Sequence, residues 1–158
     1  MFFDEWHQFD GRSREEIEAQ LSGNLNRDRL PITFVAHQDA VLLGTVSLDL
    51  TDFLPMDHLS PWLASLYVDA PFRGRGVGRA LVGHLQDFAS SRGIGPLHLW
   101  TPGSTQLYLH CGWTVFASAN YGGQPVTILR FEGEDGASPG SPWHCATGSS
   151  GFRARPPC

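Results

Sequence analysis

The sequence predicts an α/β (α+β) fold, in which helices pack on a β-sheet. Runs of apolar and β-branched residues stand on both sides of an amphipathic, helix-like segment, a pattern that favours strands and helices sharing one core. A glycine-rich loop joins one of these strand-like runs directly to the helix-like segment. The chain of 158 residues is long enough for one such domain with a substantial core.

The first part of the chain predicts one helix and three strands. Ser13 and Glu16 have the spacing of a capping box, which indicates a helix over residues 13–24. The segment 51–61 has the composition of a loop. Three β-prone runs predict strands, the first two joined by a hairpin turn, at residues 32–37, 41–50 and 62–68.

The second part of the chain begins with the glycine-rich loop and the longest predicted helix. Apolar residues after the loop recur at helical spacing, and Gly93 is expected to end this helix as a left-handed cap. Pro102 and Gly103 open a second, short helix that Gly112 ends. Three further strand-like runs follow the pattern of a sheet, at residues 97–101, 113–119 and 126–131.

The chain changes character at Gly133. The segment 133–158 is rich in glycine, serine and proline and has no apolar periodicity. Such a composition buries too little apolar surface to offset the entropy cost of ordering the chain. We therefore expect a functional domain over residues 1–132 and a disordered tail that the fold does not need.

The overall composition argues against several classes of function. A net charge of −5 is unusual for a general nucleic-acid binder, which is normally basic. No stretch approaches the roughly 18 apolar residues of a membrane span, and the acidic N-terminus is unlike a signal peptide. The three cysteines show no C-x-x-C or paired Cys/His spacing, so no metal site is expected. These features favour a cytoplasmic protein that does not bind membranes.

The glycine-rich loop is a candidate site for an anionic ligand. A strand, a glycine-rich loop and a helix N-terminus hold phosphate well, because backbone N–H groups turn toward the anion and the helix dipole adds positive charge. The Rossmann pattern fails because Leu81 stands three residues after Gly78, and the P-loop pattern fails because the chain has no Lys-Ser or Lys-Thr pair. The pattern that remains is Arg73, Gly74, Arg75, Gly76, Val77 and Gly78, followed by Arg79.

This pattern resembles the Gln/Arg-x-x-Gly-x-Gly/Ala signature of the GNAT superfamily, whose members use acyl-CoA to acylate amines. Residues 66–68, just before the loop, are similar to the superfamily's splayed central strand. Tyr108 stands four residues before the pair Gly112 and Trp113, as a tyrosine does in the late helix of the superfamily. The similarity covers about residues 32–131.

The resemblance implies a mixed, mostly antiparallel sheet with helices on both sides and a splay after Val68. It implies that loop amides bind the pyrophosphate of acetyl-CoA, that Arg73 and Arg79 supply charge nearby, and that the pantetheine arm lies against the strand as an added strand would. The cofactor-binding residues that the resemblance implies are Leu66, Tyr67, Val68, Arg73, Gly74, Arg75, Gly76, Val77, Gly78 and Arg79.

The implied reaction moves the acetyl group of acetyl-CoA to a primary amine of a small molecule or peptide, by direct attack in a ternary complex. By the resemblance, the Val68 N–H polarises the thioester carbonyl and Tyr108 protonates the departing thiolate. His110 is expected to be exposed, and Cys111 to serve packing rather than act as a nucleophile. The general base stays open among four residues on or between the strands: Asp49, Asp52, Asp57 and His58.

Two departures from the superfamily pattern leave alternatives open. No strand is evident before Ser13, so the wall that holds the acceptor is short, is supplied by the partner in a homodimer, or is absent. Thr101 and Ser104 stand where Asn and Ala are common, which alters side-chain contacts to CoA. The alternative function is a CoA-binding regulatory or interaction module without turnover. A nucleotide-binding protein is a third interpretation, weakened by the two failed phosphate motifs.

Overall fold

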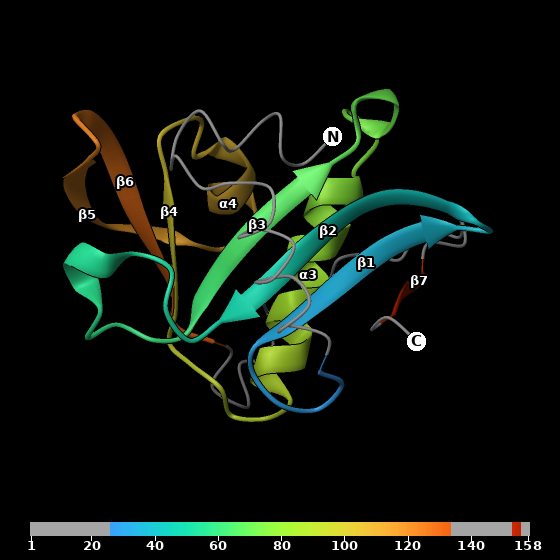
Figure 1. Cartoon of the computed structure of the whole chain (residues 1–158), viewed down its shortest axis with the longest axis horizontal. Helices are drawn as coiled ribbons and strands as arrows, with labels where there is room; N and C mark the ends of the chain where they lie inside the picture. The colour runs from blue at the N-terminus through green and yellow to red at the C-terminus, as the bar shows by residue number, and fades with distance from the viewer. Residues whose placement is uncertain (1–25, 134–152, 156–158) are drawn as a thin grey trace.

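The structure is a computed structural model that describes residues 26–133 and a short strand at residues 153–155 (Figure 1). The helix expected over residues 13–24 lies outside the described residues, as does most of the predicted tail. The strands are β1 (Ile32–Gln38), β2 (Val41–Asp49), β3 (Trp62–Val68), β4 (Leu97–Thr101), β5 (Thr114–Tyr121), β6 (Gln124–Phe131) and β7 (Arg153–Arg155). The helices are α3 (Val77–Ser90), α4 (Gln106–His110) and the 3₁₀ turns η1 (Leu54–Met56) and η2 (Ala70–Phe72).

The strands form one mixed, mostly antiparallel sheet, which confirms the predicted fold class. Their order is β5-β6-β4-β3-β2-β1-β7. Among the described strands, every neighbouring pair is antiparallel except β3 with β4. The turn between β5 and β6 uses Gly122 and Gly123 at φ 57° and 83°, a conformation that favours glycine and suits a tight hairpin. Three residues of the predicted tail form β7, which pairs with β1 from Val35 to His37.

The strands β3 and β4 lie together at one end and separate toward the other (Figure 1). Within the described residues their register contains the single pair Trp62 and His98, where the His98 N–H donates to the Pro61 carbonyl over 3.0 Å. The gap therefore opens just beyond Trp62. The expectation that the splay begins after Val68 is wrong, because strand pairing is set by a partner distant in the sequence and not by the strand itself.

A β-bulge in β3 lies beside this gap. The register between β2 and β3 passes from Ser47 opposite Ala64 to Thr45 opposite Tyr67, so β3 carries one extra residue. Ser65, at φ 54°, is in the left-handed region that non-glycine residues rarely adopt. Bulges bend a strand and re-aim the residues that follow. The bulge thus changes the direction of β3 as it runs along the gap.

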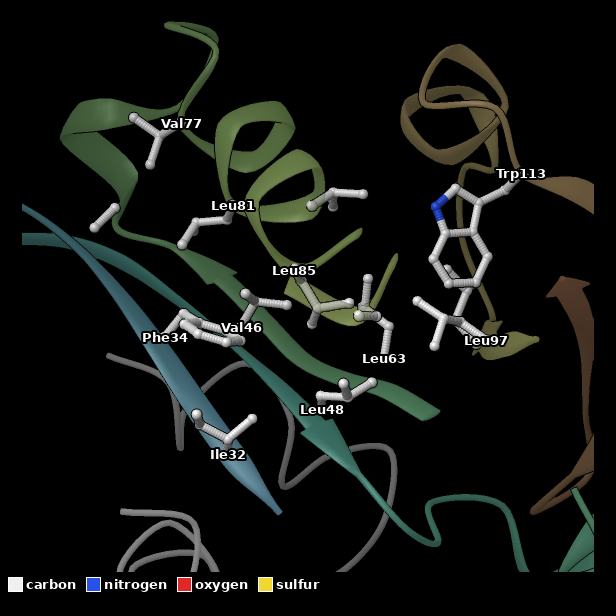
Figure 2. Close-up of a cluster of buried hydrophobic side chains, with 14 of the residues drawn as sticks. Ile32, Phe34, Val46, Leu48, Leu63, Val77, Leu81, Leu85, Leu97 and Trp113 are labelled. Atoms are coloured by element: carbon white, nitrogen blue, oxygen red, sulfur yellow. The ribbon is translucent and has the colours of Figure 1, made fainter. Parts of the chain in front are cut away.

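The main core lies between α3 and one face of the sheet. Leu81 and Leu85 of α3 are fully buried and point toward Phe34, Val46 and Leu63 on the strands (Figure 2). Full burial of each such side chain contributes about 1.5–3 kcal/mol. A smaller cluster of Phe53, Trp62, Val126 and Ile128 forms separately. Because Trp62 and Leu63 are neighbours on β3 and belong to different clusters, the two clusters lie on opposite faces.

Both described α-helices pack on the main core, since Tyr108 and Cys111 at α4 contact the same cluster as α3. Helices on both sides of the sheet stay a prediction, because the third predicted helix falls on residues 13–24, outside the described residues. Helix α4 begins at Gln106, later than predicted, because the backbone first turns at Gly103, whose N–H donates to the Thr101 hydroxyl over 3.2 Å. At the end of α3, Gly93 has φ 64°, as predicted for a left-handed cap.

Candidate functional site

The loop between β3 and α3 presents backbone groups toward solvent. Gly74 and Gly76 have φ 72° and 82°, and a Cβ on either would meet nothing within 4 Å, so the outer side of the loop is open. The Ala80 N–H donates to the Gly76 carbonyl over 2.9 Å. This bond begins α3, and the N–H groups of the preceding residues stand at the helix N-terminus, where helical geometry leaves them for other partners. The arrangement suits an anion.

The arginines of the loop differ in their contacts. Arg75 and Arg79 are exposed. Arg73 is also exposed, but its Nε–H donates to the Val68 carbonyl over 2.8 Å and its guanidinium lies 5.7 Å from the centroid of the Tyr67 ring. Arg73 therefore ties the loop to the end of β3. The Arg73 guanidinium can also supply positive charge near a bound phosphate.

The backbone of β3 faces the gap through alternate residues. The Asp69 N–H donates to the Leu43 carbonyl of β2 over 2.9 Å. The N–H and C=O of one strand residue point to the same side, and those of the next residue point to the other side. The polar groups of Val68, and of Leu66 two residues earlier, therefore point away from β2 into the gap. The Val68 carbonyl is taken by Arg73. The Val68 N–H is left facing the gap, as a carbonyl-polarising donor requires.

Three segments that are distant in the sequence meet at Gly78. A Cβ added there would lie 3.5 Å from Cγ2 of Val68 and 3.6 Å from Cδ2 of Leu107. The start of α3, the end of β3 and helix α4 are thus in direct proximity. A second link joins the helices, because Nε2 of the buried Gln86 donates to the Cys111 carbonyl over 2.8 Å. The loop, the end of β3 and the helix that carries the candidate acid therefore lie side by side.

Tyr108 is held in α4 against the main core. The centroid of its ring lies 6.3 Å from that of the Trp113 ring in an edge-to-face arrangement. The backbone N–H of Trp113 donates to the Tyr108 carbonyl over 3.1 Å. Burial raises the pKa of Tyr108 to about 12, with a further contribution from Cys111. The hydroxyl is therefore protonated at neutral pH and can donate to an anion. His110 is exposed and Cys111 packs against the core, as expected.

Two of the four proposed bases lie toward the other end of β3. Asp49 is 3% exposed at the end of β2 and stands opposite Trp62 in the register. A strand rises about 3.3 Å per residue, which separates Trp62 from Val68 by on the order of 20 Å along β3. Asp52 accepts a hydrogen bond from Nε1 of Trp100 over 2.7 Å. This bond gives the Asp52 carboxylate a structural partner.

The other two proposed bases, Asp57 and His58, are exposed in the segment after η1. A further titratable residue, which the sequence did not reveal, is buried at the narrow end of the gap, where β3 and β4 are still paired. The wide end is the opposite end, next to the glycine-rich loop. The buried titratable residue is His98 on β4, which is 3% exposed and whose pKa burial lowers. A histidine between two apolar residues of a short strand gives no sequence signal for this position. Gln86, which joins α3 to α4, likewise looks like an ordinary helix residue.

No helix within residues 26–133 is long and apolar enough to cross a membrane. In the same part of the chain, no group of three or more His, Cys, Asp or Glu side chains is arranged to hold a metal ion.

The splayed strand pair and the Arg/Gly loop at a helix N-terminus define an α/β domain suited to an extended anionic cofactor. A sequence model of the acetyltransferase (GNAT) family matches residues 1–113. The chain therefore belongs to the acetyltransferase (GNAT) family.

One curated relative is similar over a short region. N-alpha-acetyltransferase 80 of Mus musculus is 39% identical over 67 residues, which are 42% of this chain and 19% of the mouse protein. The chain thus spans about a fifth of the length of that relative.

Solved structures are similar over most of the chain. The IAA acetyltransferase from Bacillus cereus has a TM-score of 0.57 at 21% identity, covering 80% of this chain and 88% of that chain. The ribosomal-protein-S18-alanine N-acetyltransferase from Escherichia coli has a TM-score of 0.57 at 23% identity, covering 75% and 80%. An acetyltransferase of Bacillus subtilis in complex with CoA has a TM-score of 0.59 at 17% identity, covering 83% and 90%. At these identities the likeness establishes the fold.

Proposed function

We propose that this chain is an N-acetyltransferase that moves the acetyl group of acetyl-CoA to a primary amine by direct attack in a ternary complex. The observation that carries the proposal is the meeting at Gly78 of the loop, the end of β3 and helix α4. This arrangement supports a single site in which a cofactor bound by the loop reaches both a backbone donor and a tyrosine hydroxyl.

In the proposed complex, the loop amides from Arg75 to Gly78 bind the pyrophosphate at the N-terminus of α3. The exposed Arg75 and Arg79 side chains add positive charge. The pantetheine arm lies in the gap beside β3 and bonds to the backbone of Leu66 in the manner of an added strand, which leaves the Val68 N–H for the thioester carbonyl. The lack of β4 pairing beyond Trp62 supports this position, because in the described part of the chain it leaves that edge of β3 open.

Catalysis in this proposal uses groups at the same edge. The neutral amine attacks the thioester carbon, and the Val68 N–H stabilises the oxyanion that forms. The amine nitrogen loses one N–H proton to a base or to solvent as the amide forms. The C–S bond then breaks, and the departing thiolate takes a proton from the Tyr108 hydroxyl, which solvent later replaces. The protonated state of Tyr108 supports its role as the donor.

The acceptor is proposed to be a small molecule or a peptide with a free amine. The name of the mouse relative favours an α-amino group of a peptide as the first class to test. A spermidine N-acetyltransferase and an aminoglycoside acetyltransferase, both at 19% identity, show the same fold and keep other amines in the test set.

The test measures free CoA thiol when the full chain is incubated with acetyl-CoA and, separately, peptides with free α-amines, polyamines, amino acids and aminoglycosides. We expect thiol release that depends on one acceptor class and falls strongly in Tyr108→Phe. Cofactor binding without release in any pool would favour the alternative, a CoA-binding module without turnover. One observation favours this alternative: Asp49, a candidate base, stands opposite Trp62 and is therefore far along β3 from Val68, where the thioester carbonyl is proposed to lie.

A further inference from the structure

Helix α4, which carries Tyr108, is too short to be stable on its own. It has five residues, Gln106–His110, and none of them is fully buried. Isolated helices shorter than about 12 residues are marginal in water, and most helical stability in proteins comes from packing against other elements. The position of the Tyr108 side chain is therefore set by what α4 contacts in the rest of the domain.

One side of α3 lies against α4. Gly78, Val82 and Gln86 are spaced four residues apart, so they form one row along α3. A Cβ added to Gly78 would lie 3.6 Å from Cδ2 of Leu107, in the first turn of α4. At the other end of the row, Nε2 of Gln86 donates to the carbonyl of Cys111, the residue that caps the C-terminus of α4, over 2.8 Å. The row on α3 thus lies beside both ends of α4.

The link at Gln86 is more specific than the contact at Gly78. Apolar contact is non-directional, whereas a hydrogen bond requires a narrow range of distance and angle. Among the buried residues of α3, all of which the structure describes, Gln86 alone is polar. A buried amide is costly unless it is hydrogen bonded. The Gln86 amide therefore favours one position of α4 on α3 over its neighbours.

The residue that Gln86 binds is itself bonded to Tyr108. The Cys111 N–H donates to the Tyr108 carbonyl over 2.9 Å, and the Trp113 N–H donates to the same carbonyl over 3.1 Å. Two hydrogen bonds through the single residue Cys111 thus join the Gln86 side chain to the Tyr108 backbone. A shift of the C-terminal end of α4 would move Tyr108 with it.

We propose that Gln86 is a positioning residue for the transfer reaction, because its hydrogen bond to Cys111 holds α4 where the Tyr108 hydroxyl can reach the departing thiolate. This inference rests on the proposed function, in which the N-terminus of α3 binds the pyrophosphate. The same helix then holds both the cofactor and the acid. Gln86 lies eight residues after Gly78, about 12 Å along a helix that rises about 1.5 Å per residue. It therefore acts through Tyr108 and touches no reacting atom.

The main test is a double-mutant cycle of Gln86→Met and Tyr108→Phe, with peptide α-amines, spermidine and lysine as acceptors. Methionine is similar in length to glutamine and removes the N–H donor. We expect Gln86→Met to lower kcat by about 10- to 100-fold with an unchanged KM for acetyl-CoA, since a misplacement of about 1 Å can cost about 10²-fold. In the Tyr108→Phe background the same substitution should lower kcat by less than about twofold, because no hydroxyl is left to position.

The variant Gln86→Glu gives a second readout. The introduced carboxyl has the shape of the amide, but it can donate to the Cys111 carbonyl only while it is protonated. The ordinary pKa of a glutamate is about 4.3, and burial raises it. The ratio of the variant's kcat to that of the wild type should therefore rise as pH falls through this raised pKa. In the control Ser91→Ala, which removes the hydroxyl that donates to the Phe88 carbonyl over 2.9 Å at the end of α3, the ratio should stay constant.

The outcomes separate the two proposals. An equal loss of kcat from Gln86→Met with and without the Tyr108 hydroxyl overturns the positioning role and leaves the proposed function standing, as does a ratio for Gln86→Glu that is independent of pH. A wild type that binds acetyl-CoA but acetylates none of these acceptors overturns both. If Gln86→Met fails to fold by circular dichroism, Gln86→Asn takes its place in the cycle, because it keeps the amide but is one methylene too short to reach Cys111.

Discussion

The two ends of the gap between β3 and β4 differ in composition and exposure. The wide end has the exposed loop, with Gly74 and Gly76 in left-handed conformations and the exposed cationic side chains of Arg75 and Arg79. The narrow end is closed by the buried rings of Trp62 and His98, with Phe116 beside them. The wide end offers backbone N–H groups and positive charge to an anion. The narrow end instead buries the imidazole of His98 among aromatic rings. We therefore propose that the wide end determines cofactor affinity and that residues along the gap determine the rate of transfer.

The largest expected effect is at the wide end. Gly76→Asp adds a carboxylate where the pyrophosphate approaches, and we expect it to abolish CoA binding in calorimetry while the fold survives. Gly76→Asn is the matched control, because asparagine has the same shape and shares the strain of a side chain at φ 82° without the charge. Equal affinity in wild type and Gly76→Asp would reject this location for the phosphates.

The next largest effect concerns Tyr108. Tyr108→Phe retains the ring that packs near Trp113 and removes the hydroxyl, so kcat should fall by about 10²- to 10⁴-fold while acetyl-CoA affinity stays nearly unchanged. Because the pKa of Tyr108 is raised to about 12, the fold-loss should be the same at neutral and mildly alkaline pH. A tyrosine that only packs would behave differently, with full activity and a change of stability of about 0.5–1.5 kcal/mol.

A smaller effect separates charge from hydrogen bonding at Arg73. Its Nε–H donates to the Val68 carbonyl, and glutamine carries an N–H donor on the same carbon, Cδ, that bears Nε in arginine. We expect Arg73→Gln to retain most of the wild-type kcat and Arg73→Met to lose roughly tenfold, about the contribution of one hydrogen bond. Steady-state kinetics on both variants measure this. An equal loss of acetyl-CoA affinity in both would show that the charge of Arg73 matters instead.

The smallest effect is expected far from both ends. Truncation after Glu132 removes β7, which pairs with three residues of β1 at the opposite edge of the sheet. We expect a change in Tm of no more than a few degrees and no change in cofactor affinity or kcat. A loss of cofactor affinity on truncation would mean that the tail contributes to the site, contrary to the role expected from its composition.

The sequence predicted the wide end better than the narrow end for a physical reason. The loop is made of contiguous residues, 73–79, whose backbone freedom and charge can be read directly from their identities. The strand positions follow from local apolar patterns, and the fold class was predicted correctly. The environment of His98 is built by Trp62, Phe116 and Arg130, which come from three other strands. No local pattern reveals such a neighbourhood.

The same reasoning explains the other differences from expectation. The bulge at Ser65 and the early opening of the gap depend on how β3 is paired with β2 and β4, and pairing is not encoded in one segment. The hydrogen bond between Trp100 and Asp52 joins residues 48 positions apart. The roles proposed for Asp49, Asp57 and His58, the cytoplasmic location and the homodimer stay predictions.

The most direct test of the central claim follows backbone amide resonances by NMR while acetyl-CoA is added to the full chain. If the loop and the gap hold the cofactor, we expect further shifts at Leu66 and Val68, little change along β1, and the largest shifts at Arg75, Gly76, Val77 and Gly78. Replacement of acetyl-CoA by CoA should alter the resonances along the gap and leave those of the loop in place. Shifts confined to other surfaces, or no saturable shift at the loop, would contradict the claim that the gap and its loop hold the acetyl donor.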